Sequence, residues 1–312
     1  MKFSIIIPVA PYRDAEILNS LKDLDFPKKK YEIIVEKGTN ASENRNRGFE
    51  KSKGKIIVFL DDDAVADKEL LKNAEKFFKE HPEIDIIGGP QLTPPDEKGF
   101  AKISGYALSS KFGGWNASNR YGKKKLNLNA DDTYLTSAIM FCKREVMNKI
   151  KFDKNLWPGE DSKFVIDAKK LGMKIAYCPD LIIYHRRRPT AKALIKQIYN
   201  YGKDLAQRES FFETIKRPFF LAPGIFFVYL LLLPFILLIM QLIFENWKID
   251  LIILFPLILY LFLDFIFSVY EGIKNKDFFS IFLLFFIFPI IHLSHGAGWF
   301  CNYLKIDRTK TN

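Results

Sequence analysis

The first two thirds of the chain alternate short apolar runs with segments of helical periodicity. Apolar runs of strand length occupy residues 4–8, 31–35, 55–60 and 84–88. Between them lie segments 14–24, 42–51 and 67–80, which have the apolar spacing of amphipathic helices. This order predicts an α/β domain with a mostly parallel sheet covered by helices. In open sheets of this kind, ligands bind beyond the carboxyl ends of the strands.

The last third has a different pattern, in which three long apolar segments follow one another. Segments 219–244, 251–270 and 278–304 each reach the roughly 20 residues that a membrane-spanning helix needs. Residues 219–304 contain only eight charged residues. We expect a small helical membrane domain of about three helices, which Pro223, Pro234, Pro256 and Pro289 kink or end. The alternative is a set of buried helices in a soluble core.

Basic residues that flank the apolar segments indicate an orientation. They are Lys216 and Arg217 before the first segment, Lys274 and Lys276 after the second, and Lys305, Arg308 and Lys310 after the third. The positive-inside tendency assigns the first two groups to the cytoplasmic face. Three spans would then place the third group outside, which conflicts with the same tendency. A re-entrant or broken third segment, which contains His292 and His295, is the alternative.

Residues 186–217 form a basic bridge between the two parts. They include nine basic and three acidic residues, and so carry more than half of the chain's net charge of +11. With apolar residues interleaved, this stretch predicts amphipathic helices on an anionic membrane surface. A solvated helix packed on the sheet is the alternative, and we expect no nucleic acid partner. The predicted division is therefore 1–185, 186–217, 218–304 and a polar tail, 305–312.

The remaining composition excludes several classes of protein. Hydrophobic residues make up 48% of the chain, which excludes a disordered or collagen-like protein. The three cysteines, Cys142, Cys178 and Cys301, have no C-x-x-C spacing and fit a reducing cytosol. The first apolar run is too short for a signal peptide.

Three acidic residues, Asp61, Asp62 and Asp63, follow directly after the apolar strand that ends at Leu60. Carboxylates this close repel one another unless a cation lies among them, and Mg²⁺ binds through one or two carboxylates plus substrate phosphates. The sequence is equally consistent with an acidic turn that caps the helix near Asp67.

Two further motifs lie downstream. Glu160 and Asp161 open an amphipathic helix, where one of them could be a general base or both could simply favour the helix dipole. His185 ends an apolar strand and precedes Arg186, Arg187 and Arg188. Histidine is a common metal ligand and arginine suits diphosphate recognition, although a surface histidine beside membrane-facing arginines is the simpler interpretation.

The order of these motifs resembles the GT-A fold of family 2 glycosyltransferases. Residues 4–8, 31–35, 45–48, 54–61 and 172–179 resemble further segments of that family, and the resemblance covers roughly residues 3–202. Segment 197–202, with apolar segments downstream, resembles the membrane-attached branch of the family.

The resemblance implies roles for individual residues. Asp61 and Asp63 would bind Mg²⁺ or Mn²⁺, His185 would complete the metal site, and Asp161 would be the catalytic base with Glu160 beside it. The expected nucleotide-sugar contacts are Pro8, Glu36, Arg45, Asn46, Asp61 and Asp62. The expected acceptor or diphosphate contacts are Trp157, Gly159, Arg186 and Gln197.

The sequence also departs from the family pattern. Lys37 follows Glu36 where the family usually has acidic residues, which leaves the nucleotide (UDP- or GDP-linked) open. Processive members carry Gln-x-x-Arg-Trp, whereas this chain has Asn200 and Tyr201 at the last two positions. We therefore expect the transfer of a single sugar.

The expected function is an inverting, metal-dependent transfer from a nucleotide sugar to a lipid-linked acceptor at the cytoplasmic face of the cell membrane. One alternative is a polyprenyl-phosphate glycosyltransferase, whose acceptor is the lipid phosphate itself. Another is a non-catalytic membrane protein, in which the domain only binds a nucleotide or a partner subunit.

Overall fold

The computed structural model describes residues 1–156, 158–208, 211–244 and 246–309. Trp157, one of the expected acceptor contacts, lies outside the described residues. The described residues form two compact units, the first comprising residues 1–97 and 116–187, and the second residues 98–115 and 188–312. The predicted division kept residues 98–115 in the first domain, whereas their contacts are with the second unit.

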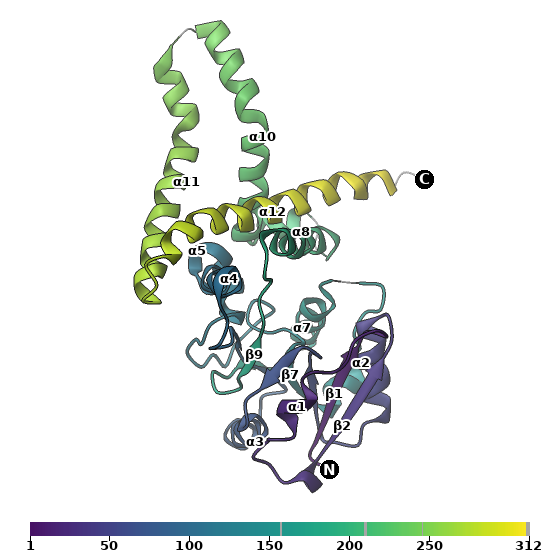
Figure 1. The fold of residues 1–312 in the computed structure, drawn as a ribbon. Coiled ribbons are helices and arrows are strands. Elements are labelled where there is room, and N and C mark those ends of the chain that lie inside the picture. The colour runs from purple at the N-terminus through teal and green to yellow at the C-terminus, as the bar shows by residue number, and fades with distance from the viewer. Residues whose placement is uncertain (157, 209–210, 245, 310–312) are drawn as a thin grey trace. The chain divides into compact units, whose positions relative to one another are not determined.

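A six-stranded sheet, with the strand order β2-β1-β3-β7-β5-β8, forms the centre of the first unit (Figure 1). The strands are β1 (Phe3–Val9), β2 (Tyr31–Lys37), β3 (Ile56–Leu60), β5 (Ile86–Gly88), β7 (Ile139–Lys143) and β8 (Ile175–Tyr177). β7 is antiparallel to both of its neighbours, and the other strand pairs are parallel. This confirms the predicted α/β class with a mostly parallel sheet.

Both faces of this sheet are covered, as the continuous apolar runs of its strands require. Ile5 and Ile7 of β1 face a core that also contains Leu70 and Phe77. Ile6, between them, faces a second core with Phe164. The helices of this unit are α1 (Leu18–Leu21), α2 (Ala41–Lys51), α3 (Leu70–Glu80), α6 (Arg144–Lys149) and α7 (Glu160–Lys170), with 3₁₀ turns η1 (Lys28–Lys30) and η2 (Trp115–Arg120). The helix expected over 14–24 is thus only one turn long.

A small second sheet lies at the carboxyl end of β3. It has the order β4-β9-β6 and consists of β4 (Ala64–Ala66), β6 (Gln91–Leu92) and β9 (Ile183–His185). β4 and β9 are antiparallel, and Ala64 pairs with His185. This register places His185 next to the residue that precedes Ala64, which is Asp63.

The second unit is helical. It contains α4 (Gly99–Ser109), α5 (Lys111–Gly114), α8 (Ala191–Arg208), α9 (Phe211–Ile215), α10 (Pro218–Phe244), α11 (Trp247–Lys274) and α12 (Ser280–Thr309). α10, α11 and residues 280–304 of α12 are long and apolar enough to cross a membrane. The prolines expected to kink or end helices lie inside them, at positions 223, 234, 256 and 289, and the helices continue past each one.

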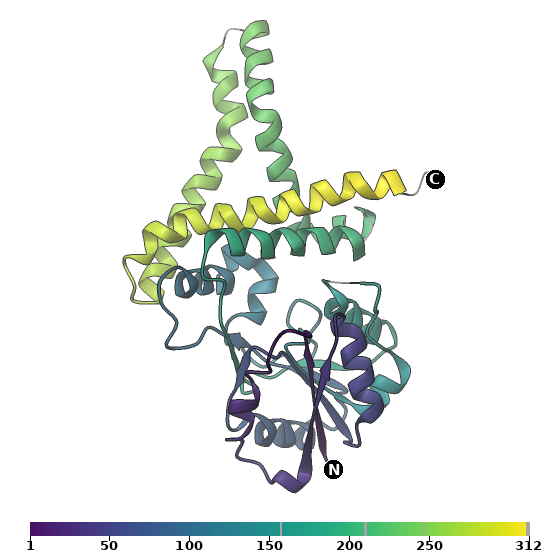
Figure 2. The same cartoon turned by 45° about the vertical axis from the view of Figure 1, so that its right-hand side comes forward.

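Glycines allow α8 and α12 to approach closely within this unit (Figure 2). A Cβ atom on Gly202 of α8 would lie 2.0 Å from the carbonyl oxygen of His295. A Cβ atom on Gly298 of α12 would lie 2.0 Å from the carbonyl oxygen of Tyr199. Neither distance is possible for real atoms, so a side chain at either position would force the two backbones apart.

We therefore expect Gly202→Ala to destabilise the second unit. Overpacking of a close contact costs about 1–3 kcal/mol, and the atom opposite is backbone, which cannot move aside. Thermal unfolding of the detergent-solubilised protein measures the loss, with Lys196→Ala on the exposed face of the same helix as the control. Equal stability of the two variants would contradict the close packing.

Candidate functional site

The three carboxylates that follow β3 lie in different environments. Asp62 is buried, whereas Asp61 and Asp63 are partly accessible. Because β3 ends at Leu60 and β4 begins at Ala64, the acidic residues form the short connection between the two sheets. The chain therefore holds them at the carboxyl edge of the large sheet, where ligands of α/β proteins bind.

Asp61, Asp63 and His185 come together at this edge. One ligand atom from each lies within 4.8 Å of the others, and His185 Nε2 is 3.0 Å from Asp63 Oδ1. The imidazole Nδ1 is 3.1 Å from the carbonyl oxygen of Arg186. The pairing of β9 with β4 is thus what brings His185, about 120 positions later in the sequence, to the carboxylates.

These three residues fit a divalent cation. Two carboxylates and one imidazole are donors that Mn²⁺ accepts readily, and Mg²⁺ binds to carboxylates with waters and substrate phosphates completing its shell. The close approach of the three side chains supports a metal site more strongly than their residue types do. If the acidic residues only capped a helix, His185 would not have to lie beside them.

Arg13, which belongs to none of the predicted motifs, also binds to this acidic cluster. Its guanidinium lies 2.9 Å from Asp63 Oδ2 and 3.4 Å from Asp62 Oδ1, and its side chain is 45% exposed. Arg13 lies in the loop after β1. Because only the parallel pairing of β1 with β3 brings that loop to the acids, sequence spacing contained no signal for it.

Arg45 connects the acidic cluster to helix α7. Its side chain is buried and lies 3.3 Å from Asp61 Oδ1 and 2.8 Å from Glu160 Oε1. Glu160 is also buried and is the first residue of α7. Arg45 was expected to contact the nucleotide; in the structure, its guanidinium holds together two acidic motifs that are separated by about 100 residues.

Asp161 is more accessible than Glu160. Its Oδ1 accepts a hydrogen bond of 2.7 Å from the backbone N–H of Ser162, and its negative charge contributes to raising the pKa of Asp61. Gly159 precedes the helix with a φ of 103°, a conformation that a residue with a side chain rarely adopts. After this turn, Glu160 is buried against Arg45 and Asp161 is the more accessible of the two carboxylates.

The pKa shifts in the cluster follow from burial and from these ion pairs. Burial raises the pKa of Asp61 despite the nearby Arg45 and His185, and it raises the pKa of Asp62 to about 6. Burial acts in the same direction on Asp63, but its bonds to His185 and Arg13 outweigh it and hold the pKa well below the usual range. Burial lowers the pKa of His185, yet the bond to Asp63 raises it overall.

Several other predicted contacts have structural partners. Asn46 donates to the carbonyl oxygen of Phe152 at 2.9 Å and accepts from its N–H at 3.1 Å, so this amide ties α2 to the loop before α7. Glu36 is buried between Lys51, at 2.6 Å, and Arg47, at 3.4 Å.

The remaining predicted contacts are spread over both units. Pro8 is buried in β1 opposite Glu36. Arg186 pairs with Asp96 at 3.0 Å. Gln197 belongs to the second unit, where it donates to the hydroxyl of Tyr201 at 2.9 Å.

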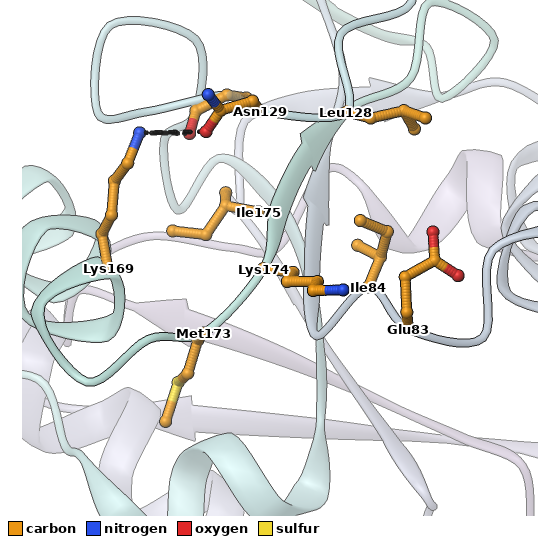
Figure 3. A pocket seen from close by; sticks show the side chains of 9 residues that line it. Glu83, Ile84, Leu128, Asn129, Lys169, Met173, Lys174 and Ile175 are labelled. Carbon is orange, nitrogen blue, oxygen red and sulfur yellow. Dashed lines mark hydrogen bonds between the residues drawn. The ribbon is translucent and has the colours of Figure 1, made fainter.

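A cavity of about 350 Å³ lies at the outer edge of the large sheet, beside β8 (Figure 3). Its lining residues are Glu83, Ile84, Leu128, Asn129, Ala130, Lys169, Met173, Lys174 and Ile175. They include none of the described residues of the predicted site. The cavity is therefore separate from the acidic cluster.

A family model described as "Glycosyltransferase like family 2" matches residues 2–199. Because this match covers more than half of the chain, the chain belongs to that family, as its motifs predicted.

Two curated relatives show how far the similarity extends. Poly(ribitol-phosphate) beta-N-acetylglucosaminyltransferase TarS of Staphylococcus aureus is 32% identical over 111 residues, which cover 26% of this chain and 19% of TarS. The chain thus spans about a fifth of that relative. Glycosyltransferase AglE of Haloferax volcanii is 26% identical over 238 residues, 65% of this chain and 73% of AglE.

Solved structures are similar at lower identity. Mannosyltransferase PcManGT from Pyrobaculum calidifontis, in complex with GDP-Man and Mn²⁺, matches with a TM-score of 0.49 and 15% identity, over 66% of this chain and 62% of that chain. TarS 1–349 in complex with UDP-GlcNAc matches with a TM-score of 0.46 and 19% identity, over 67% of this chain and 68% of that chain.

Arg45→Met should destabilise the first unit strongly. Removing one partner of a buried ion pair costs about 3–5 kcal/mol, because the other charge stays buried. Burial raises the pKa of Glu160 even beside Arg45, so without Arg45 this carboxyl should take up a proton more readily. The loss should therefore be larger at pH 8 than at pH 5.

Chemical unfolding at the two pH values measures this effect. The double variant Arg45→Met/Glu160→Gln removes the buried charge and should recover part of the stability at pH 8. A loss that neither changes with pH nor responds to Glu160→Gln would contradict the assigned pair.

The apparent affinity for Mn²⁺ should rise with pH. Below its raised pKa, His185 carries a proton that a metal ion must displace, so affinity should increase by up to about tenfold per pH unit for that proton and level off above the pKa. Titration calorimetry from pH 5.5 to 8 measures the slope. His185→Asn should bind more weakly and with a shallower slope, and an unchanged slope would exclude His185 as a ligand.

Proposed function

We propose that the protein is an inverting, metal-dependent glycosyltransferase that moves a single sugar from a UDP- or GDP-linked donor to a lipid-linked acceptor at the cytoplasmic face of the cell membrane. The observation that carries this proposal is the connection from Asp61 through Arg45 to Glu160, which holds the candidate metal ligands and the first turn of α7 at one edge of the sheet. Family membership supports the reaction class.

The donor would bind at the acidic cluster. Asp61, Asp63 and His185 would hold a divalent ion, which when bound would supply positive charge next to the departing diphosphate. Arg13 occupies one oxygen of Asp63 and reaches Asp62, and its exposed guanidinium is a second positive group available to phosphate oxygens.

Asp161 would act as the general base. It takes the proton from an acceptor hydroxyl while that oxygen bonds to the anomeric carbon, on the face opposite the diphosphate. The bond from the anomeric carbon to the diphosphate oxygen breaks, the diphosphate leaves with the electron pair, and the configuration inverts. Glu160 is unsuited to this step because Arg45 already binds it in the interior; it serves to position α7.

The membrane part of the proposal rests on the second unit. α10 and α11 expose apolar side chains over most of their lengths. In the most apolar 18-residue stretch of each helix, only 6% (α10) and 11% (α11) is buried. The adjacent α8 exposes Lys192, Lys196 and Lys203, which suit anionic headgroups. An enzyme held at the bilayer in this way would take its acceptor from the membrane, which supports a lipid-linked acceptor.

Asp161→Asn should lower kcat by about 10²–10⁴, the usual contribution of a general base. Release of nucleoside diphosphate in the presence of donor, lipid acceptor and Mn²⁺ measures it. Asp167→Asn, which removes a carboxylate from the same helix, is the matched control and should retain activity. Retained turnover in Asp161→Asn would contradict the base assignment and favour a lipid phosphate acceptor, which is already ionised.

Binding is checked separately by thermal shift. Wild type and Asp161→Asn should both be stabilised by nucleoside diphosphate with Mn²⁺, whereas Asp63→Asn should not. A panel of nucleoside diphosphates identifies the base. If none of them stabilises the wild-type protein, the donor site fails and a non-catalytic role is favoured.

A further inference from the structure

α12 has different neighbours from the other two long apolar helices. In both views it runs beside α8 and across the direction of α10 and α11 (Figures 1 and 2). It packs more extensively against α8 than against any other element, and 33% of its most apolar window is buried, compared with 6% in α10 and 11% in α11.

The first half of α12 binds residues 98–115, a segment that interrupts the first unit, which we call the catalytic unit. His292 Nε2 lies 2.8 Å from the carbonyl oxygen of Phe112 in α5, and the Phe112 ring packs on Phe288 with centroids 5.1 Å apart. The chain leaves the first unit to form residues 98–115 and then returns to it. Both ends of this segment join the first unit, and its helices α4 and α5 have only 11 and 4 residues, so neither is long enough to cross a bilayer.

The second half of α12 binds a polar helix. Beside the close contacts at Gly202 and Gly298, Asn302 Nδ2 donates to the carbonyl oxygen of Lys203 at 3.5 Å. α8 contains four lysine and aspartate side chains in its described part, Lys192, Lys196, Lys203 and Asp204. Each such charge costs several kcal/mol at the centre of a bilayer, so α8 belongs in water or at the headgroups.

Both halves of α12 are thus attached to elements that stay outside the hydrocarbon region. A helix with these neighbours along its length cannot cross the bilayer unless α8 crosses with it. An apolar helix with a polar partner is instead suited to the membrane–water interface, where one side faces acyl chains and the other faces polar groups.

The basic residues agree with this placement. If α12 crosses the bilayer, the basic residues that follow Leu304 lie on the opposite side from Lys216, Arg217, Lys274 and Lys276. If α12 lies in the interface, all three basic groups lie on the same side. Among the described helices, the ends of α10 and α11 that flank Asn246 then lie on the far side, and the sequence there has no excess of basic residues.

We propose that α12 lies along the cytoplasmic membrane surface, paired with α8, and that the hairpin of α10 and α11 is the part of the described chain that enters the hydrocarbon region. The lipid bilayer therefore covers the exposed apolar surface of these helices. The hairpin of α10 and α11 enters the bilayer, and the α8–α12 pair lies on its surface. This inference rests on the proposed membrane attachment but not on glycosyl transfer.

Single-cysteine accessibility tests the proposal on the full chain. In a Cys301→Ser background, in which Cys142 and Cys178 are buried, cysteines are placed at Lys53 in the catalytic unit, Asn246, Lys276 and Thr311. A membrane-impermeant maleimide is applied to sealed vesicles in which the catalytic unit faces outward. Lys53→Cys, Lys276→Cys and Thr311→Cys should be labelled without detergent, and Asn246→Cys only after detergent is added.

The outcomes distinguish the possible failures. If Thr311→Cys needs detergent while Lys276→Cys does not, α12 crosses the bilayer and the proposal is overturned. If Asn246→Cys is labelled without detergent, the hairpin is not inserted and the proposed membrane attachment fails as well. Labelling of all four variants in detergent establishes that each cysteine is reactive, and diphosphate release by the same vesicles reports on glycosyl transfer independently.

Discussion

Mutual repulsion among the carboxylates at the end of β3 is the constraint on which the site depends. Three adjacent acids at a strand end are stable only if positive charge is supplied from elsewhere in the fold. In this protein, Arg13 from the loop after β1, Arg45 from α2 and the imidazole of His185 from β9 meet them. Each comes from a different element, so the three groups are in place only when both sheets have formed.

The arrangement links stability to chemistry. Arg45 is buried and shared between Asp61 and Glu160, so it sets the distance between the acidic cluster and the first turn of α7. Arg13 differs in that its side chain is 45% exposed, and ion pairs that are open to solvent contribute only about 0–1 kcal/mol. The buried Arg45 thus joins the acidic cluster to α7, whereas the partly exposed Arg13 pairs with the same cluster from the solvent side.

The second unit contains long apolar helices in two different environments. Backbone contacts at Gly202 and Gly298 join a polar helix to an apolar one, and the carbonyl oxygen of Phe112 receives His292. The apolar α10 and α11 have little protein around them, whereas α12 is held by polar and backbone groups. Two kinds of apolar helix therefore follow one another in the same segment of sequence.

The sequence by itself determined the features that depend on local pattern. The continuous apolar runs at residues 4–8 and 55–60 require a sheet covered on both faces, and the acids that follow Leu60 have to lie at its carboxyl edge. The lengths of the three apolar segments likewise required long apolar helices.

Only the tertiary structure decided which residues contact one another. The pairing of Ala64 with His185, the position of Arg13 and the use of Arg45 and Asn46 as internal ties depend on contacts between residues far apart in the chain. The proposed placement of α12 could not be predicted from the sequence either. A helix that crosses a bilayer and a helix that lies along it can have the same apolar length, and only the neighbouring elements distinguish them.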